Sequence, residues 1–211
     1  GLAVRAIARD IGIAPSALYR YFPSRDELLT VLIARTYTEI DAVIEAAVAK
    51  AMVDHPADPV AAWVSATMAY RQWVMEHLSQ FSLVYGTPVP GYHAPDETRD
   101  VGKRAGAALG RIVIDAARKD LVDTAVVHER QATMSDGMRS SVGELVTALQ
   151  LDDLDGVAVG LFVMAVGAWA KVQGLIAMEV LGHMPMFGPH AEEFVRSESA
   201  ALVERFIVPS R

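Results

Sequence analysis

The first 29 residues carry the pattern that most constrains the fold of this 211-residue chain. Apolar residues at Ile7, Ala8 and Ile11 recur at helical spacing and predict a helix with one buried face. Gly12 follows, at a point where a sharp turn needs the left-handed backbone conformation. Pro15 stands where the first turn of a second helix accepts proline. Two short helices joined by a tight turn are the layout of a helix-turn-helix DNA reader.

The second helix divides into a buried face and an outward face. Leu18 and Phe22 lie four residues apart and are expected to pack this helix against the first, and Pro23 ends it. A helix that presents tyrosine, arginine and small side chains suits the major groove of DNA and its phosphates. The outward residues are Ser16, Ala17, Tyr19, Arg20 and Tyr21.

This segment resembles the DNA-binding domain of TetR-family transcriptional regulators. The resemblance implies an all-helical dimer, with the DNA reader at the N-terminus and a ligand-receiving helical bundle behind it. It rests on Ala3-Val4-Arg5-x-Ile7-Ala8, Gly12-Ile13, Leu18-Tyr19-x-Tyr21-Phe22 and Arg25-x-Glu27-Leu28-Leu29. Together with the outward face, it indicates as DNA-binding residues Arg5, Ser16, Ala17, Tyr19, Arg20, Tyr21 and Arg25.

The chain departs from the family pattern at three positions and in its length. Ala3 and Ala14 stand where the family has threonine and serine, and a missing helix cap costs about 0.5–2 kcal/mol. Arg25 replaces the usual lysine, keeps the charge and can hold a phosphate by two bonds. Family members carry a whole helix before this point. We therefore interpret Gly1 as a truncated start, which the missing initiator methionine supports.

The charge of the chain is unevenly divided. The formal net charge is −7, yet residues 1–25 hold four arginines against one aspartate, which leaves −10 on the remainder. A basic end on an acidic body directs the DNA reader to the phosphates and keeps the rest of the protein away from them. Cysteine is absent, so neither a disulfide scaffold nor thiol chemistry is available. We expect a DNA-binding domain at 1–48 and a ligand-binding and dimerisation domain at 49–211.

Beyond Phe22 the apolar spacing predicts an all-α chain without strands. Ser24-Arg25-Asp26-Glu27 is a capping box that begins a long helix, and this helix links the DNA reader to the body. Proline and glycine predict an irregular loop at 86–95, and 120–139 has no clear period. The expected helices are 24–52, 60–78, 79–86, 96–119, 140–150, 153–183 and 190–207.

Three glycines at seven-residue intervals mark the expected helix at 153–183. Each costs about 1 kcal/mol in a helix relative to alanine, so their common face predicts the close approach of another helix. The last expected helix, 190–207, is also amphipathic, and these two helices from each of two subunits form a four-helix bundle. The alternative is that the stripe packs inside one subunit. The expected dimer interface comprises Gly160, Gly167, Gly174, Leu181, Phe194, Leu202 and Phe206.

Large apolar side chains gather in the body helices and have two interpretations. The first is an ordinary core. The second is a mostly apolar ligand pocket with a few polar anchors, which the nine methionines and the aromatic residues make adaptable. Segments 81–86 and 169–174 also resemble the C-terminal domain of one TetR branch, where they form bundle and dimer helices. The pocket residues expected are Trp63, Tyr70, Arg71, Trp73, His77, Phe81, Tyr85, Met164, Trp169 and Gln173.

Other functional classes find little support in the sequence. It contains no Gly-rich phosphate loop, Gly-x-Ser-x-Gly elbow or His-Glu-x-x-His motif. The spacing of His183 and His190 matches no standard metal site, so no metal, cofactor or catalytic residue is expected. The uncharged run at 157–170 is shorter than the roughly 20 residues that a membrane span needs. The composition fits a soluble intracellular protein, so we expect the cytoplasm.

We therefore expect a transcriptional repressor that is not an enzyme. Its expected partners are a two-fold DNA operator, a small apolar or aromatic effector that releases it, and a second copy of the chain. The main alternative is a helical ligand-binding or partner-binding dimer without specific DNA binding. A weaker one is an enzyme built on a helical bundle.

Overall fold

The computed structural model describes residues 12, 14–96, 98, 101–102, 107–154 and 156–208. No strand forms among these residues, and an isolated bridge joins Val122 to Ile207. The expected all-α class is confirmed. The elements are α2 (Pro15–Tyr21), α3 (Arg25–Asp54), α4 (Pro59–Glu76), α5 (Leu78–Tyr85), α7 (Ala107–Arg118), α8 (Thr124–Ala132), α9 (Asp136–Ala148), the 3-10 helix η1 (Asp152–Leu154), α10 (Ala158–Val180), the 3-10 helix η2 (Pro185–His190) and α11 (Ala191–Glu204).

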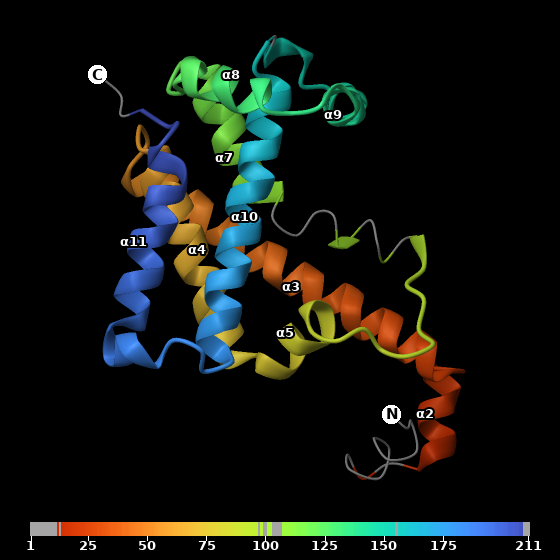
Figure 1. The fold of residues 1–211 in the computed structure, drawn as a ribbon. Helices are drawn as coiled ribbons and strands as arrows, with labels where there is room; N and C mark the ends of the chain where they lie inside the picture. Colours follow the sequence, from red (N-terminus) through yellow and green to blue (C-terminus); the bar gives the residue numbers. More distant parts are fainter. Residues whose placement is uncertain are drawn as a thin grey trace.

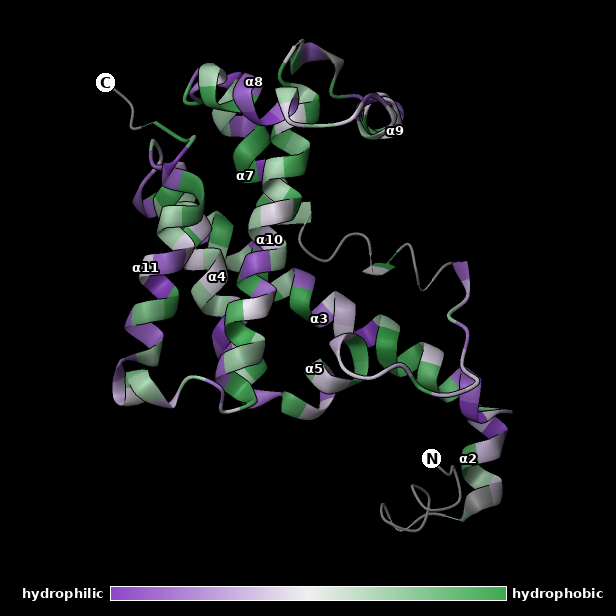
Figure 2. Cartoon of the chain, viewed as in Figure 1, coloured by the Kyte–Doolittle hydropathy of each residue, from purple (hydrophilic) through white to green (hydrophobic). Residues whose placement is uncertain are grey.

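The helices form a body and an arm. In the body, α4, α10 and α11 stand side by side, with α8 and α9 across one end (Figure 1). α3 leaves this body at an angle and carries α2 at its far end, while the chain after α5 runs alongside α3 toward α2 (Figure 1). The green, hydrophobic residues of α4, α7 and α10 gather where these helices face one another (Figure 2).

α2 forms as the sequence predicts. Gly12 has a φ of 73°, the left-handed turn expected there, and a proline occupies the first turn of the helix. Ala14 provides no side-chain cap, also as expected. Leu18 is buried against Leu28 and the half-buried Phe22, which fixes the roll of α2 on the first turn of α3.

α3 is the element that joins the two parts of the molecule. The Ser24 hydroxyl accepts a hydrogen bond of 3.1 Å from the Glu27 amide, which confirms the capping interaction. The helix runs for 30 residues, so it spans about 45 Å at 1.5 Å per residue. It buries Ile33, Ile40 and Ile44 along one side. This side reaches from the α2 end of the arm into the body.

The body core is built around α4 and α10. α4 begins after Asp58, whose carboxylate accepts from the Ala61 amide at 2.9 Å. Trp63 and Tyr70 of α4 and Val172 and Ile176 of α10 have no exposed surface. Burial of side chains this large contributes about 1.5–3 kcal/mol each, so these residues are a main source of the stability of the body.

The region 120–139 contains one helix and the start of another. Asp123 caps α8, and Ser135 caps α9, which begins at Asp136, four residues before the expected start at 140. The only α8 residue that is fully buried is Val127. Because so little of α8 faces the core, no apolar period was visible in the sequence.

The expected helix at 153–183 is interrupted. Residues 152–154 form η1, and α10 begins at Ala158 after Gly156, whose φ of 77° ends the regular backbone. α10 is long and apolar enough to cross a membrane by length and composition alone. In this structure it packs against α4, α7, α8, α9 and α11 instead.

Two residues expected at the dimer interface lie inside the subunit. A Cβ on Gly160 would lie 2.6 Å from Val127 Cγ1, so this glycine allows α8 to approach α10 within one chain. Phe206 is 1% exposed, because α11 ends at Glu204 and the chain then turns into the core. For these two residues the dimer prediction was wrong, and the alternative of packing inside one subunit holds at Gly160.

Gly160→Ala is expected to lower the free energy of unfolding by about 1–3 kcal/mol, the cost of overpacking. The added Cβ would also meet the Val127 carbonyl oxygen at 2.9 Å, and backbone cannot rotate away. The matched control is Gly143→Ala on α9, where a Cβ meets nothing within 4 Å, and it should gain up to about 1 kcal/mol. Urea unfolding at one protein concentration measures both. An unchanged urea midpoint for Gly160→Ala would contradict the packing described here.

Candidate functional site

The outward face of α2 is exposed as predicted. Ser16, Tyr19, Arg20 and Tyr21 all lie on the surface, while Ala17 is half-buried. The Arg20 guanidinium lies 5.1 Å from the centre of the Tyr21 ring, and its Nη2 donates to the Tyr21 hydroxyl at 3.2 Å. These contacts hold the guanidinium extended over an aromatic ring. An arginine held in this way can donate to base edges or to phosphate oxygens.

Two further residues expected to bind DNA differ in their surroundings. Arg25 is ion-paired with Asp26 at 2.8 Å, and its Nη2 donates to the Pro90 carbonyl at 3.4 Å. A phosphate at Arg25 therefore competes with a carboxylate. Arg5 lies outside the described residues.

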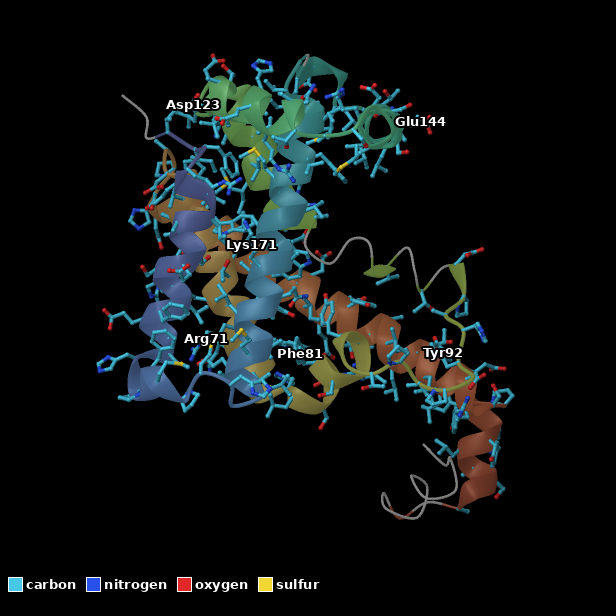
Figure 3. The ribbon with its side chains drawn as sticks, in the orientation of Figure 1. Arg71, Phe81, Tyr92, Asp123, Glu144 and Lys171 are labelled. Carbon is cyan, nitrogen blue, oxygen red and sulfur yellow. The ribbon has the colours of Figure 1, made fainter. Side chains whose placement is uncertain are left out.

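The loop after α5 ties the arm to the body. Residues 86–95 are irregular, as the prolines and glycines predicted. The Tyr92 hydroxyl lies 3.0 Å from the Thr30 hydroxyl on the second turn of α3. Figure 3 shows Tyr92 beside the end of α3 that carries α2. This contact therefore links the loop after α5 to the part of α3 that lies next to α2.

Five of the expected pocket residues gather in one aromatic cluster between α4, α5 and α10. The Tyr70 hydroxyl donates to Gln173 Oε1 at 2.5 Å, and the Tyr70 and Trp169 rings are 5.1 Å apart. Phe81 packs against Tyr85 with ring centres 5.5 Å apart. These are geometries in which aromatic pairs add stability beyond area burial.

Tyr37 of α3 belongs to the same cluster and was missed by the sequence analysis. Its ring meets the Tyr85 ring edge-on at 6.1 Å. Its position inside a long amphipathic helix hid it among ordinary core positions. Through Tyr37 the cluster reaches the arm as well as the body.

The polar groups of this cluster are neutral. Burial raises the pKa of Tyr70 and of Tyr85 above the usual range, so both stay protonated at any physiological pH. Gln173 Nε2 is buried and makes no hydrogen bond with any described residue. The cluster therefore offers uncharged donors and acceptors in apolar surroundings.

The other expected pocket residues lie in the core or in contacts with neighbouring side chains and helices. Trp63 and Met164 are buried in the core. His77 stacks on Trp73 with ring centres 4.9 Å apart, and its Nδ1 lies 2.8 Å from the Trp73 carbonyl oxygen. Arg71 binds Glu179 of α10 through two hydrogen bonds of 2.7 and 2.5 Å and Glu192 of α11 at 3.1 Å (Figure 3). Arg71 thus joins three helices instead of facing an open pocket.

A cavity of about 640 Å³ opens beside this cluster, between α7, the end of α9 and α10. Trp169 is the one expected pocket residue among those that line it. The sequence analysis missed the contribution of α7, although Leu109, Ile112, Val113 and Ala116 follow a clear helical period. Its lining is Ala107, Leu109, Gly110, Arg111, Val113, Ile114, Asp115, Arg118, Leu149, Gln150, Leu151, Leu154, Ala158, Leu161, Phe162, Ala165, Val166 and Trp169.

A separate face of α10 is open. A Cβ on Gly167 or Gly174 would meet nothing within 4 Å, and Leu181 is 67% exposed on the same side. Phe194 and Leu202 of α11, also expected at the interface, are half-buried against the core. The structure therefore brings three of the seven expected interface residues to one open face.

The comparisons with known proteins agree on one family. Residues 1–32 match the family model described as bacterial regulatory proteins, tetR family, and residues 63–202 match the Tetracyclin repressor-like C-terminal domain. The HTH-type transcriptional regulator Rv1816 of Mycobacterium tuberculosis is 35% identical over 184 residues, which are 86% of this chain and 73% of that protein. The regulator Mb1846 of Mycobacterium bovis has the same identity and coverage.

Solved structures share the fold. The crystal structure of a candidate regulatory protein, SCO4313, matches with a TM-score of 0.64 and 28% identity, covering 96% of this chain and 85% of that one. A protein of unknown function from Rhodococcus sp. RHA1 matches with a TM-score of 0.68 at 20% identity, covering 98% and 85%. The latter is a likeness of fold alone.

Removal of Glu179 is expected to lower the free energy of unfolding more than removal of Glu192. Glu179 is 9% exposed, and Glu179→Ala leaves the Arg71 guanidinium buried without its main partner, at about 3–5 kcal/mol. A guanidinium is not deprotonated in proteins, so Arg71 keeps its charge when Glu179 is removed. Glu192 is 54% exposed, and Glu192→Ala should cost less than about 1 kcal/mol. Chemical denaturation compares the two, and equal losses would contradict the assignment of Arg71 as a buried junction.

Proposed function

Because the chain belongs to the TetR family of bacterial transcriptional regulators, we propose that it is a repressor released from its operator by a small apolar or aromatic ligand. Members of this family are DNA-binding regulators rather than enzymes, and this chain is a helix-turn-helix regulator of the same class. The proposal concerns the sign of regulation, the dimer and the effector.

The exposed face of α2 carries the proposal. Ser16, Tyr19, Arg20 and Tyr21 stand together on a short helix whose other side is held by Leu18 and Leu28. A helix fixed in this way enters the major groove as a rigid unit. Residues 1–25 carry a formal charge of +3 and the remainder of the chain carries −10, which orients this end toward DNA.

We assign the DNA contacts by side-chain chemistry. Arg20, Tyr19 and Ser16 read bases or nearby phosphates, and Ala17 lets the backbone approach or meets a thymine methyl. Tyr21, together with Arg5 and Arg25, holds the phosphate backbone.

A two-fold operator requires a dimer, and the open face of α10 suits one. Gly167 and Gly174 have no packing role inside the subunit, so their missing side chains leave room for a partner helix. Met178 and Leu181 add exposed apolar surface beside them. Pairing of α10 and α11 with the same helices of a second copy makes a four-helix bundle and sets the two α2 helices about one DNA turn apart, or a multiple of it.

Release by a ligand follows the contacts between body and arm. The aromatic cluster touches α3 through Tyr37 and Tyr85, and the loop touches it through Thr30 and Tyr92. A ligand that shifts α5 or α10 tilts α3 and spoils the spacing of the two DNA readers. A differential affinity of about 1–3 kcal/mol between the two states is typical of such coupling.

The remaining parts of the proposal are the division into domains and the cellular location. We keep the division into a DNA-binding domain at 1–48 and a ligand-binding and dimerisation domain at 49–211, with α3 continuous across the boundary. We propose the cytoplasm as the site of action, where the operator is accessible.

Arg20→Ala is expected to weaken specific operator binding by about 1–3 kcal/mol if Arg20 reads a base, and to flatten the salt dependence if it only holds a phosphate. The measurement is a gel-shift titration of the full-length protein on DNA from its own promoter region. It is run at two salt concentrations with excess competitor DNA. The control is Arg139→Ala on α9, which removes the same charge at the far end of the body (Figure 1).

A discrete shifted band that survives competitor supports the proposed regulator. Unchanged affinity of Arg20→Ala would remove that residue from the interface. A smear that salt abolishes, or no shift for the parent protein, would instead favour a ligand-binding dimer that does not read DNA.

Gly174→Glu is expected to convert the dimer to a monomer of 22.8 kDa while leaving the fold intact. The new side chain enters open space within the subunit, but it places a carboxylate in the proposed interface. Sedimentation velocity measures the mass, and circular dichroism measures helix content. Gly137→Glu on α9 is the control, since a side chain there also meets nothing within 4 Å. A Gly174→Glu protein that remains dimeric would rule out this face.

A further inference from the structure

The cavity between α7, α9 and α10 has a lining that selects its occupant. Leu109, Val113 and Leu161 are almost fully buried and form its floor. Leu149 and Val166 are each 51% exposed at its margin, where an occupant would shield them from water. A volume of about 640 Å³ lies in the range of pockets that hold small molecules.

The cavity is elongated. On α10 it is lined by Ala158, Phe162, Ala165 and Trp169. These residues are three or four positions apart, so they lie on a single face of the helix. At 1.5 Å per residue this wall is about 16 Å long. Because Gly167 and Gly174 lie on another face of α10, the cavity is separate from the proposed dimer surface.

The charged groups at the rim already have partners. Arg111 binds Glu45 of α3 at 2.5 Å. Arg118 binds Asp153 through hydrogen bonds of 2.7 and 3.2 Å, with Asp115 at 3.7 Å on its other side. Two guanidinium groups thus face three carboxylates, so an anionic ligand finds no unpaired cation among the described lining residues. A cationic ligand would have to displace an arginine from its ion pair.

Gln150 supplies the uncharged polar contact. It is the one lining residue with a neutral amide side chain, and it stands just after α9 with a φ of 57°. This left-handed conformation is uncommon for a residue other than glycine and costs about 1–2 kcal/mol. The strained backbone is therefore retained at the edge of the cavity.

We propose that this cavity binds an uncharged, elongated apolar molecule, with its apolar body along α10 and one neutral hydrogen-bonding group at Gln150. This inference rests on the proposed ligand release, because it names the class of effector. It also assigns the sensor. Trp169 closes one end of the cavity and touches Tyr70, which bonds Gln173 in the aromatic cluster. An occupant that presses on Trp169 therefore acts on the cluster that reaches α3.

The test compares three probes with the same chain and different heads: decanol below its solubility limit, and decanoate and decylammonium below their micelle concentrations. Calorimetric titration of the full-length protein, without DNA, measures their affinities. Decanol is expected to bind at least tenfold tighter than either ion. Decanoate binding equally well or better would overturn the inference, as would the absence of decanol binding.

Two variants test whether decanol binds in this cavity. Ala165→Trp fills the α10 wall and should weaken decanol binding at least tenfold, whereas Ala42→Trp on the exposed side of α3 should not change it. Gln150→Gly relieves the strained backbone and removes the amide. It should raise the unfolding midpoint and weaken decanol binding about fivefold, which corresponds to one hydrogen bond of about 1 kcal/mol. Unchanged affinity in both variants would assign decanol to another site and overturn the inference.

The inference and the proposed function fail in different ways. Decanol binding in the cavity by a protein that does not bind operator supports the cavity assignment and contradicts the repressor. Operator binding without decanol binding contradicts the cavity assignment alone. If Ala165→Trp splits the dimer in sedimentation instead of weakening decanol binding, the cavity is part of a subunit interface and the inference is wrong.

Discussion

α10 is apolar around most of its circumference, so several neighbours must cover it. A helix of this kind is stable in water only where it is enclosed. One side forms the wall of the cavity with α7 in the first half of the helix and completes the body core in the second half. The opposite side carries two glycines where an added Cβ would meet none of the described residues within 4 Å. The first side is represented by Leu161, Ala165, Trp169, Val172 and Ile176, and the second by Gly167, Gly174 and Leu181.

One helix therefore carries part of the core, the wall of the cavity and the face proposed for the dimer. Tyr70 and Gln173 link the cavity end of α10 to α4, and Arg71 with Glu179 links its C-terminal end to α4 and α11. α3 joins these contacts to α2, and the contact between Thr30 and Tyr92 lies near that end of α3. The body and the arm of this TetR-family chain are therefore joined by a set of short contacts along two long helices.

Local chemistry made the DNA-reading end predictable. Gly12, Pro15 and the Ser24 cap act within a few residues of their own positions, and each has the expected conformation. The sequence also predicted which positions of α2 are buried and which are exposed. Leu18 points away from Tyr19 and Tyr21 on a helix. The body helices α3, α4 and α5 were found for the same reason, within two residues of their ends.

The body sites were only partly predictable. Tyr70, Phe81, Tyr85, Trp169 and Gln173 were expected in a pocket, and they do meet one another. The same reasoning did not separate these residues from Trp63, which is plain core, because size and polarity do not report which helices face each other.

The amino-acid sequence alone determined the family, the helical class and the exposed face of α2, because these depend on spacing along one helix and on neighbouring caps. Tertiary structure decided which apolar side chains surround a cavity and which fill the core. It also decided that Gly160 faces α8 while Gly167 and Gly174 face outward. Those outcomes depend on contacts between helices far apart in the chain, and the residues on a helix surface do not by themselves specify what packs against them.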